Sequence, residues 1–175
     1  MFYFIYRIPM SIVPPVIAGM VVLWAIIMHF KPRKYDKTAG IINRIMLLVS
    51  VLGIVYITLF REGTHGREVY LMPFHILSEA VGETDFYRSM LMNIFLFVPF
   101  GIFAPFSLPK KLKTNKKILI TVLTAVILSV SVELMQYVFC KGRCETDDVL
   151  CNAAGAVIGS VSYILYKIKD KTSNE

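Results

Sequence analysis

The chain has 175 residues, of which 56% are hydrophobic and only 18% are charged, and its formal net charge is +7. Ordinary globular chains carry about 25% charged residues. A basic net charge is typical of nucleic-acid-binding proteins, but a chain this apolar is not typical of a soluble protein of that class. Its length corresponds to a single domain.

Five long runs of the chain contain almost no charged residues. A helix needs about 20 apolar residues to cross the hydrocarbon core of a bilayer, and these runs are too long and too unalternating for strands. The predicted fold class is therefore an all-α polytopic membrane protein with about five transmembrane helices. They are expected at about residues 8–30, 39–60, 89–108, 118–140 and 149–167. The first run could instead be a signal peptide, but Pro14, Pro15 and the lack of a small-residue cleavage site favour a membrane anchor.

The basic residues alternate between the two sides of the predicted helices. Thirteen of the 19 Lys and Arg residues follow the first helix, the third helix or the last helix, and six fall on the other side. The positive-inside rule then places the N-terminus outside and the C-terminus in the cytoplasm. With three acidic residues inside and nine outside, the charge divides into +10 and −3.

The predicted segments form three parts. These are two N-terminal helices with a basic cytoplasmic loop in residues 1–66, a main domain in residues 67–167, and a cytoplasmic tail in residues 168–175. The main domain begins within an external loop at residues 61–88. Its apolar stretch Leu71–Leu77 could lie in the outer headgroup layer as an interfacial or re-entrant segment. His75 within this stretch is more typical of an interfacial residue than of a catalytic base.

Glu133 is a carboxylate within a predicted transmembrane helix. A charge there costs at least ~2.5 kcal/mol on insertion scales, which makes this residue a candidate for function. Gln136 lies on the same helix face, where it could bind a ligand or form a packing hydrogen bond between helices. Ser129 lies one turn below Glu133 on that face.

An acidic turn follows the fourth predicted helix. Asp147 and Asp148 could cap the fifth helix at the positive end of its dipole, but the turn also holds Arg143 and Glu145. Helix directions bring seven polar residues to one depth near the external face, although direction alone does not make them neighbours. We expect a ligand-binding layer formed by Asn93, Glu133, Gln136, Arg143, Asp147, Asp148 and Asn152.

Metal and disulfide patterns are weak in this sequence. Glu145, Asp147 and Asp148 could hold Mg²⁺ or Ca²⁺ through oxygen ligands, but no spacing typical of a zinc site occurs. Cys140 and Cys144 could form a disulfide bond. With no nucleotide-binding motif and no serine elbow, we expect no metal and no cofactor.

Small residues and prolines mark two further features of the predicted helices. Gly155 and Gly159 form a small-xxx-small face, which predicts close packing against another helix. Pro99 and Gly101 predict a kink or break near the middle of the third helix.

Three ordered motifs resemble the VanZ-like family. Residues 93–101 fit the pattern N-x-x-(L/I)-F-x-P-F-G, residues 133–136 fit E-x-x-Q, and residues 147–159 fit D-D-x-x-x-N-x-x-G-x-x-x-G. The segment at residues 70–74 is similar to the family's N-L-x-P-F segment, with Tyr70 in place of the Asn. Arg143 is similar to a basic residue that often precedes the acidic pair. The resemblance covers roughly residues 67–165.

The resemblance implies a multi-pass bacterial plasma-membrane protein that acts on the cell envelope. The family is similar to a product associated with resistance to the lipoglycopeptide teicoplanin. Together with the polar layer, this predicts binding or handling of a lipid-tailed ligand, either a lipoglycopeptide or a lipid-linked envelope precursor. Membrane lipid is the other expected partner, and nucleic acid is not expected. In this interpretation Arg143 pairs with an anionic ligand group.

Two alternatives come from other functional classes. In a membrane enzyme, Glu133 would act as a general acid or base, while Asp147 and Asp148 would bind a metal or take part in acid–base chemistry. A flippase or partner subunit is the other, although the sequence has no ATP-binding motif and few spans for an independent pump.

Overall fold

A computed structural model describes residues 36–60, 69–73, 84–139 and 144–172, together with positions 15 and 19. Its helices are α2 (Asp36–Phe60), α4 (Thr84–Ser107), α5 (Thr114–Val138) and α6 (Thr146–Thr172). Two short strands, β1 (Val69–Tyr70) and β2 (Cys144–Glu145), complete the described elements. The helix predicted at residues 8–30 lies outside the described residues apart from positions 15 and 19. It therefore stays a prediction.

All four helices are long and apolar enough to cross a membrane. The 25 residues of α5 extend over roughly 37 Å at 1.5 Å per residue, which exceeds the hydrocarbon core of a bilayer. Each helix also exposes large apolar side chains, such as Leu48 and Leu52 on α2 and Leu123 and Ile127 on α5. Exposed apolar faces of this kind fit lipid, so the prediction of a mostly helical membrane protein is confirmed for these four helices.

All four helices begin before the predicted boundaries, and α6 also ends beyond its predicted end, because charged residues near the helix ends belong to the helices. α5 begins at Thr114 and includes Lys116 and Lys117, and α6 begins at Thr146 and continues to Thr172. Acidic side chains in a first turn and basic ones in a last turn complement the helix dipole, and α6 has both. α4 is one continuous helix through Pro99, so the structure excludes the break of the predicted kink or break, and the kink stays a prediction.

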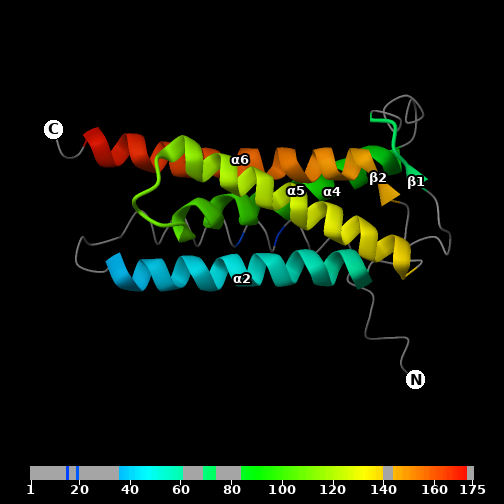
Figure 1. Ribbon diagram of the computed structural model, residues 1–175, viewed down its shortest axis with the longest axis horizontal. Coiled ribbons are helices and arrows are strands. Elements are labelled where there is room, and N and C mark those ends of the chain that lie inside the picture. Colours follow the sequence, from blue (N-terminus) through cyan, green and yellow to red (C-terminus); the bar gives the residue numbers. More distant parts are fainter. Residues whose placement is uncertain are drawn as a thin grey trace, which may run out of the picture.

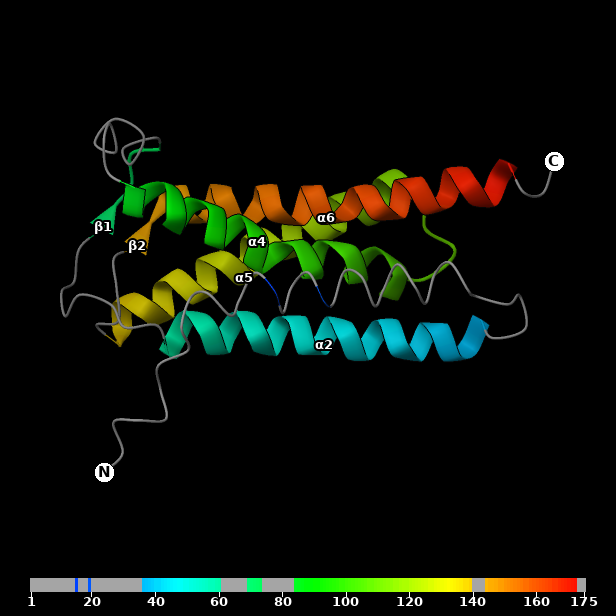
Figure 2. The ribbon, with the colours of Figure 1, turned by 180° about the vertical axis from the view of Figure 1, so that it is seen from behind.

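α4 occupies the centre of the bundle. Figure 2 shows α4 between α6 and α2, with α5 behind it, and Figure 1 shows α5 crossing in front of α4 when the bundle is seen from the other side. α4 and α6 begin at the same end of the bundle and run in the same direction. α5, which lies between them in the sequence, runs in the opposite direction. The buried core centres on Phe97, Ile54, Ala125 and Ala156 from the four helices.

The α4–α6 interface depends on glycines. A Cβ atom added at Gly155 would overlap the carbonyl oxygen of Ile94, and one added at Gly159 would overlap that of Val98. Gly101 has the same relation to the carbonyl of Ala156. The two backbones therefore lie in direct contact, which confirms the packing role predicted for the small residues of α6.

Pro105 and Pro109 each leave a carbonyl group of α4 without its helical donor, and side chains of neighbouring helices approach both carbonyls. Pro105 has no N–H to donate to Gly101, whose carbonyl oxygen lies 3.4 Å from the Ser160 hydroxyl, which also donates to the Ala156 carbonyl oxygen of its own helix at 2.8 Å. Pro109 likewise leaves the carbonyl of Pro105 without its helical donor. The Lys117 ammonium donates to that carbonyl oxygen at 3.2 Å and to the Leu108 carbonyl oxygen at 3.3 Å.

Lys117 is only 3% exposed although it belongs to the predicted cytoplasmic basic loop. Its ammonium also lies 5.0 Å from the ring centroid of Tyr163 on α6, within cation–π range. Lys117 is therefore a buried link between α4, α5 and α6, which charge counting alone does not reveal.

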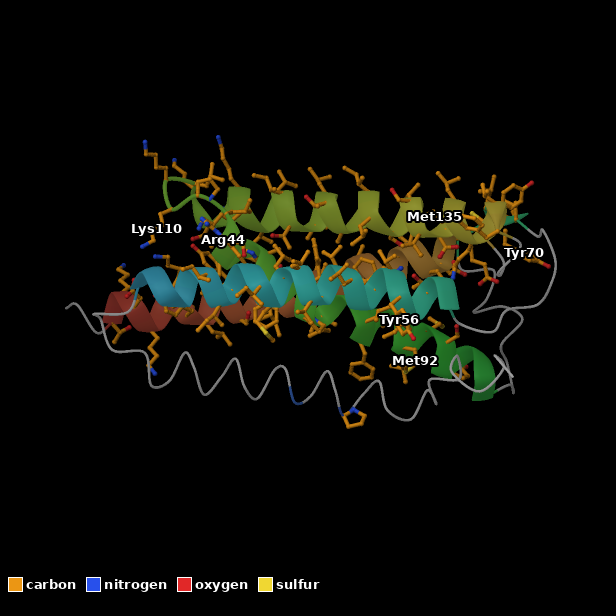
Figure 3. All side chains as sticks on the ribbon, turned by 90° about the horizontal axis from the view of Figure 1, so that it is seen from below. Arg44, Tyr56, Tyr70, Met92, Lys110 and Met135 are labelled. Carbon is orange, nitrogen blue, oxygen red and sulfur yellow. The ribbon has the colours of Figure 1, made fainter. Side chains whose placement is uncertain are left out.

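The two ends of the described bundle carry opposite charge. Figure 3 shows Arg44 and Lys110 at one end, here called the basic end, and Tyr70 at the other. The second end is here called the strand end because it holds β1 and β2. Among the described residues it carries the carboxylates of Glu133, Glu145, Asp147 and Asp148.

Replacing Gly155 by Ala should separate α4 from α6, because the new methyl group overlaps the Ile94 carbonyl. Overpacking of this kind costs about 1–3 kcal/mol. The measurement is the thermal unfolding midpoint in detergent micelles. Gly53→Ala is the matched control, since a Cβ at Gly53 on α2 meets nothing within 4 Å. Equal midpoints for the two variants would contradict the glycine contact.

Replacing Lys117 by Met should leave the Pro105 and Leu108 carbonyl groups without their side-chain donor. An unsatisfied buried polar group costs about 1–3 kcal/mol, so the unfolding midpoint should fall. Lys116→Met removes the same charge from an exposed neighbouring position and should change the midpoint little. If both substitutions have the same effect, the buried link contributes nothing specific.

Candidate functional site

One face of α5 carries buried polar residues at the strand end. Ser129, Glu133 and Gln136 follow a spacing of four and three residues, which places them on one side of a helix. All three side chains are buried, and Glu133 is only 3% exposed. The Gln136 amide donates to the backbone carbonyl oxygen of Thr58 on α2 at 3.0 Å. The packing hydrogen bond considered for Gln136 is therefore present.

Asn152 of α6 joins this polar face. Its side-chain nitrogen donates to the Ser129 hydroxyl at 2.7 Å, and Asn152 is 3% exposed. Among the described residues, the Asn152 side-chain oxygen has no hydrogen-bond donor. A buried polar atom without a partner is uncommon in folded proteins and calls for an explanation.

Asn93 lies at the same level on α4. Gly155 packs against Ile94 and the Cβ of Phe97. Asn93 precedes Ile94 by one residue and Asn152 precedes Gly155 by about one turn, so both lie on the strand-end side of this contact, within a few ångströms of one another along the bundle axis. Asn93 is 7% exposed, and its side-chain nitrogen has no acceptor within the described part of the chain. Two amides with spare hydrogen-bonding atoms therefore share one layer.

The strand end closes over Glu133. β1 pairs with β2 in parallel, with Val69 opposite Cys144 and Tyr70 opposite Glu145. The Thr146 hydroxyl donates to the Leu71 carbonyl oxygen at 3.2 Å, and the backbone N–H of Glu145 donates to a carboxylate oxygen of Glu133 at 3.1 Å. The segment before α4 is thus tied to the start of α6 above the buried carboxylate.

Leu71 and Met72 in this tied segment are each 74% exposed. Their exposure fits the predicted interfacial segment, although the rest of that stretch, including His75, lies outside the described residues. The lipid contact of this segment stays a prediction.

The acidic pair occupies the first turn of α6, where it complements the positive end of the helix dipole. Asp147 is buried and Asp148 is half-buried. Arg143 lies outside the described residues, so its place relative to the acidic pair is not assigned. Within the described ranges, no three His, Cys, Asp or Glu side chains are grouped so that they could hold a metal ion.

The pKa of the Cys144 thiol depends on the carboxylates around it. It is a free thiol, and the predicted partner Cys140 lies outside the described residues. Burial raises the pKa of the Cys144 thiol above its ordinary value, and the carboxylates of Glu133, Asp148 and Glu145 raise the pKa further. The thiol of Cys144 therefore lies in the negative electrostatic potential of these three carboxylates.

The structure places most of the seven predicted residues at the strand end. Six are described, and contacts join Gln136 to α2, Glu133 to β2 and Asn152 to Ser129. Ser129 was missing from the predicted layer, although its spacing from Glu133 was already visible in the sequence. The carbonyl of Thr58 and the N–H of Glu145 could not have been found, because backbone groups carry no sequence signal. Ligand binding by these residues stays a prediction.

Comparison with known proteins gives one consistent result. The VanZ/LLP1 family pattern matches residues 17–167, which extends the resemblance beyond residues 67–165 and into the first predicted helix. A relative named Protein VanZ, from Enterococcus faecium, is 26% identical over 146 residues, covering 77% of this chain and 80% of the relative. No solved structure matches significantly.

The pKa of Cys144 should fall when Glu133 is changed to Gln, because the substitution removes a nearby negative charge. At a fixed pH near 8, more thiolate forms and alkylation of Cys144 becomes faster. The measurement is the rate of modification against pH in a Cys140→Ser, Cys151→Ser background. Asp170→Asn removes a charge from α6 near the basic end and should leave the profile unchanged. An unshifted profile for Glu133→Gln would show that no charge at Glu133 acts on the thiol.

Proposed function

Because the chain belongs to the VanZ/LLP1 family, we propose that it is a cell-envelope protein of the bacterial plasma membrane that binds a lipid-tailed ligand. The ligand is a lipoglycopeptide such as teicoplanin or a lipid-linked envelope precursor, and binding contributes to glycopeptide resistance. The chain is a multi-pass membrane protein, consistent with its four apolar helices.

The proposed topology puts the strand end outside and the basic end in the cytoplasm, with a fifth span at residues 8–30. The charge distribution supports it, since Arg44, Lys110 and Lys171 lie toward one end and the acidic turn before and within early α6 lies toward the other. The strand end then faces the outer leaflet, where lipid-tailed envelope molecules are found.

The layer of Asn93 and Asn152 is the observation that carries the proposal. Their spare amide atoms are buried between helices at membrane depth, where water does not satisfy polar groups freely. A ligand with a polar part and an apolar tail could satisfy these atoms while its tail stays against the exposed apolar faces of α5 or α6. Arg143, which immediately precedes Cys144 in the sequence, would pair with an anionic group of the ligand.

An enzymatic use of Glu133, Asp147 and Asp148 stays an alternative prediction. Nothing in the described geometry favours it over binding, since the Glu133 carboxylate already accepts the Glu145 N–H.

The proposal predicts that a teicoplanin derivative with a diazirine in its lipid tail labels the protein in membranes on irradiation. Asn152→Leu should reduce labelling several-fold, because the polar part of the ligand loses a partner while the apolar surface remains. Asn115→Leu is the matched control, since Asn115 is exposed at the basic end of α5.

A resistance measurement accompanies the labelling. Expression in a susceptible bacterium should raise the inhibitory concentration of teicoplanin and not that of a glycopeptide without a lipid tail. Labelling that is equal in the wild type, Asn152→Leu and Asn115→Leu would contradict a site in the Asn93–Asn152 layer. Absence of any labelling would contradict binding of this ligand.

A further inference from the structure

The register between α5 and α6 defines a floor beneath the two asparagines. Asn152 bonds to Ser129, and Lys117 lies over the ring of Tyr163. The two helices are antiparallel, so a step of four residues toward the basic end leads from Ser129 to Ala125 on α5 and from Asn152 to Ala156 on α6. Ala125 and Ala156 therefore form the next layer toward the basic end, and both are fully buried. The polar Asn93–Asn152 layer is therefore bounded on its basic-end side by this apolar layer of alanines.

The layer above is occupied by Glu133, whose carboxylate accepts the N–H of Glu145. Gln136 is likewise committed to the carbonyl oxygen of Thr58. Between this layer and the alanine floor, two buried side-chain atoms of the described residues have no hydrogen-bond partner: the oxygen of Asn152, an acceptor, and the nitrogen of Asn93, a donor. Both are uncharged, and the Ser129 hydroxyl nearby accepts from the Asn152 nitrogen.

We propose that the Asn93–Asn152 layer binds an uncharged group that both donates and accepts a hydrogen bond, namely an amide or a hydroxyl group. This inference rests on the proposed function and names the part of the ligand that enters the bundle. The group accepts from the Asn93 nitrogen and donates to the Asn152 oxygen, so both buried atoms are satisfied at once.

Charged groups do not satisfy both atoms. A phosphate accepts from Asn93, but it has no proton to give Asn152 when fully ionised, and it approaches the carboxylates of Glu133 and Asp148. An ammonium donates to Asn152 and leaves the Asn93 nitrogen facing a positive charge. Burying either ion beside an apolar floor also carries a large desolvation cost.

The test uses four probes that share one dodecyl chain with a diazirine and differ only in their head group. The heads are a glucoside, a peptide-like amide, a phosphate and an ammonium, and the protein is held in phosphatidylcholine nanodiscs. Cross-linking of the α4 and α6 peptides is quantified by mass spectrometry over a range of probe concentrations. The glucoside or the amide should label at concentrations about tenfold lower than either charged probe, a difference that corresponds to one hydrogen bond.

Asn93→Leu removes the buried donor without adding a charge, so it should remove this tenfold preference. Asn152→Leu removes the buried acceptor and should have the same effect, while Asn115→Leu should change nothing. Monodispersity on size exclusion identifies variants that fail to fold, and the wild-type ranking of the four heads decides the inference without them. Equal labelling by all heads, or a preference for phosphate or ammonium, would overturn it.

The outcome is separable from that of the proposed function. Selective labelling by the uncharged heads without labelling by the teicoplanin derivative would support this binding chemistry and refute the proposed ligand. Teicoplanin labelling without selectivity among the four heads would support the ligand and refute the chemistry. A preference for glucoside over amide, or the reverse, assigns the group to a sugar or to a peptide portion.

Discussion

The backbone contact between α4 and α6 is the constraint on which the other features of the bundle depend. In lipid there is little hydrophobic drive between helices, so van der Waals packing and hydrogen bonds hold them together. Gly155 and Gly159 allow the α6 backbone to reach the carbonyl groups of α4 directly. That close approach places Asn93 and Asn152 on the same side of the glycine contact, and it brings the Ser160 hydroxyl to 3.4 Å from the carbonyl oxygen of Gly101.

The same packing accounts for how the bundle tolerates its polar residues. Near the basic end, Lys117 donates to carbonyl groups freed by the prolines and the end of α4. Near the strand end, Gln136 and Ser129 bond across helices. Among the described residues, only three buried side-chain polar atoms lack partners, and two of them belong to Asn93 and Asn152. Spare hydrogen-bonding capacity is therefore concentrated in one layer.

Hydrophobic run length predicted the four described helices and their order, because crossing a bilayer imposes a minimum length on each. Charge position does not predict the helix ends, because a lysine can be buried inside a helix, as Lys117 is in α5. Depth was predictable for Glu133 and Asn152 from helix direction. Their lateral neighbours were not, since these depend on how helices rotate about their axes. The tie between Thr146 and Leu71 involves a backbone carbonyl, which no residue pattern reveals.

Glu133 takes a different place once its surroundings are known. As an isolated carboxylate in a predicted span, it was the strongest candidate for a binding residue. In the structure its oxygen accepts the N–H of Glu145, immediately before α6, where the helix dipole favours negative charge. This contact occupies one carboxylate oxygen of Glu133 without any ligand. The Glu133–Glu145 contact does not explain the two unsatisfied amide atoms one layer deeper. Asn93 and Asn152 are therefore stronger candidates for ligand recognition than Glu133.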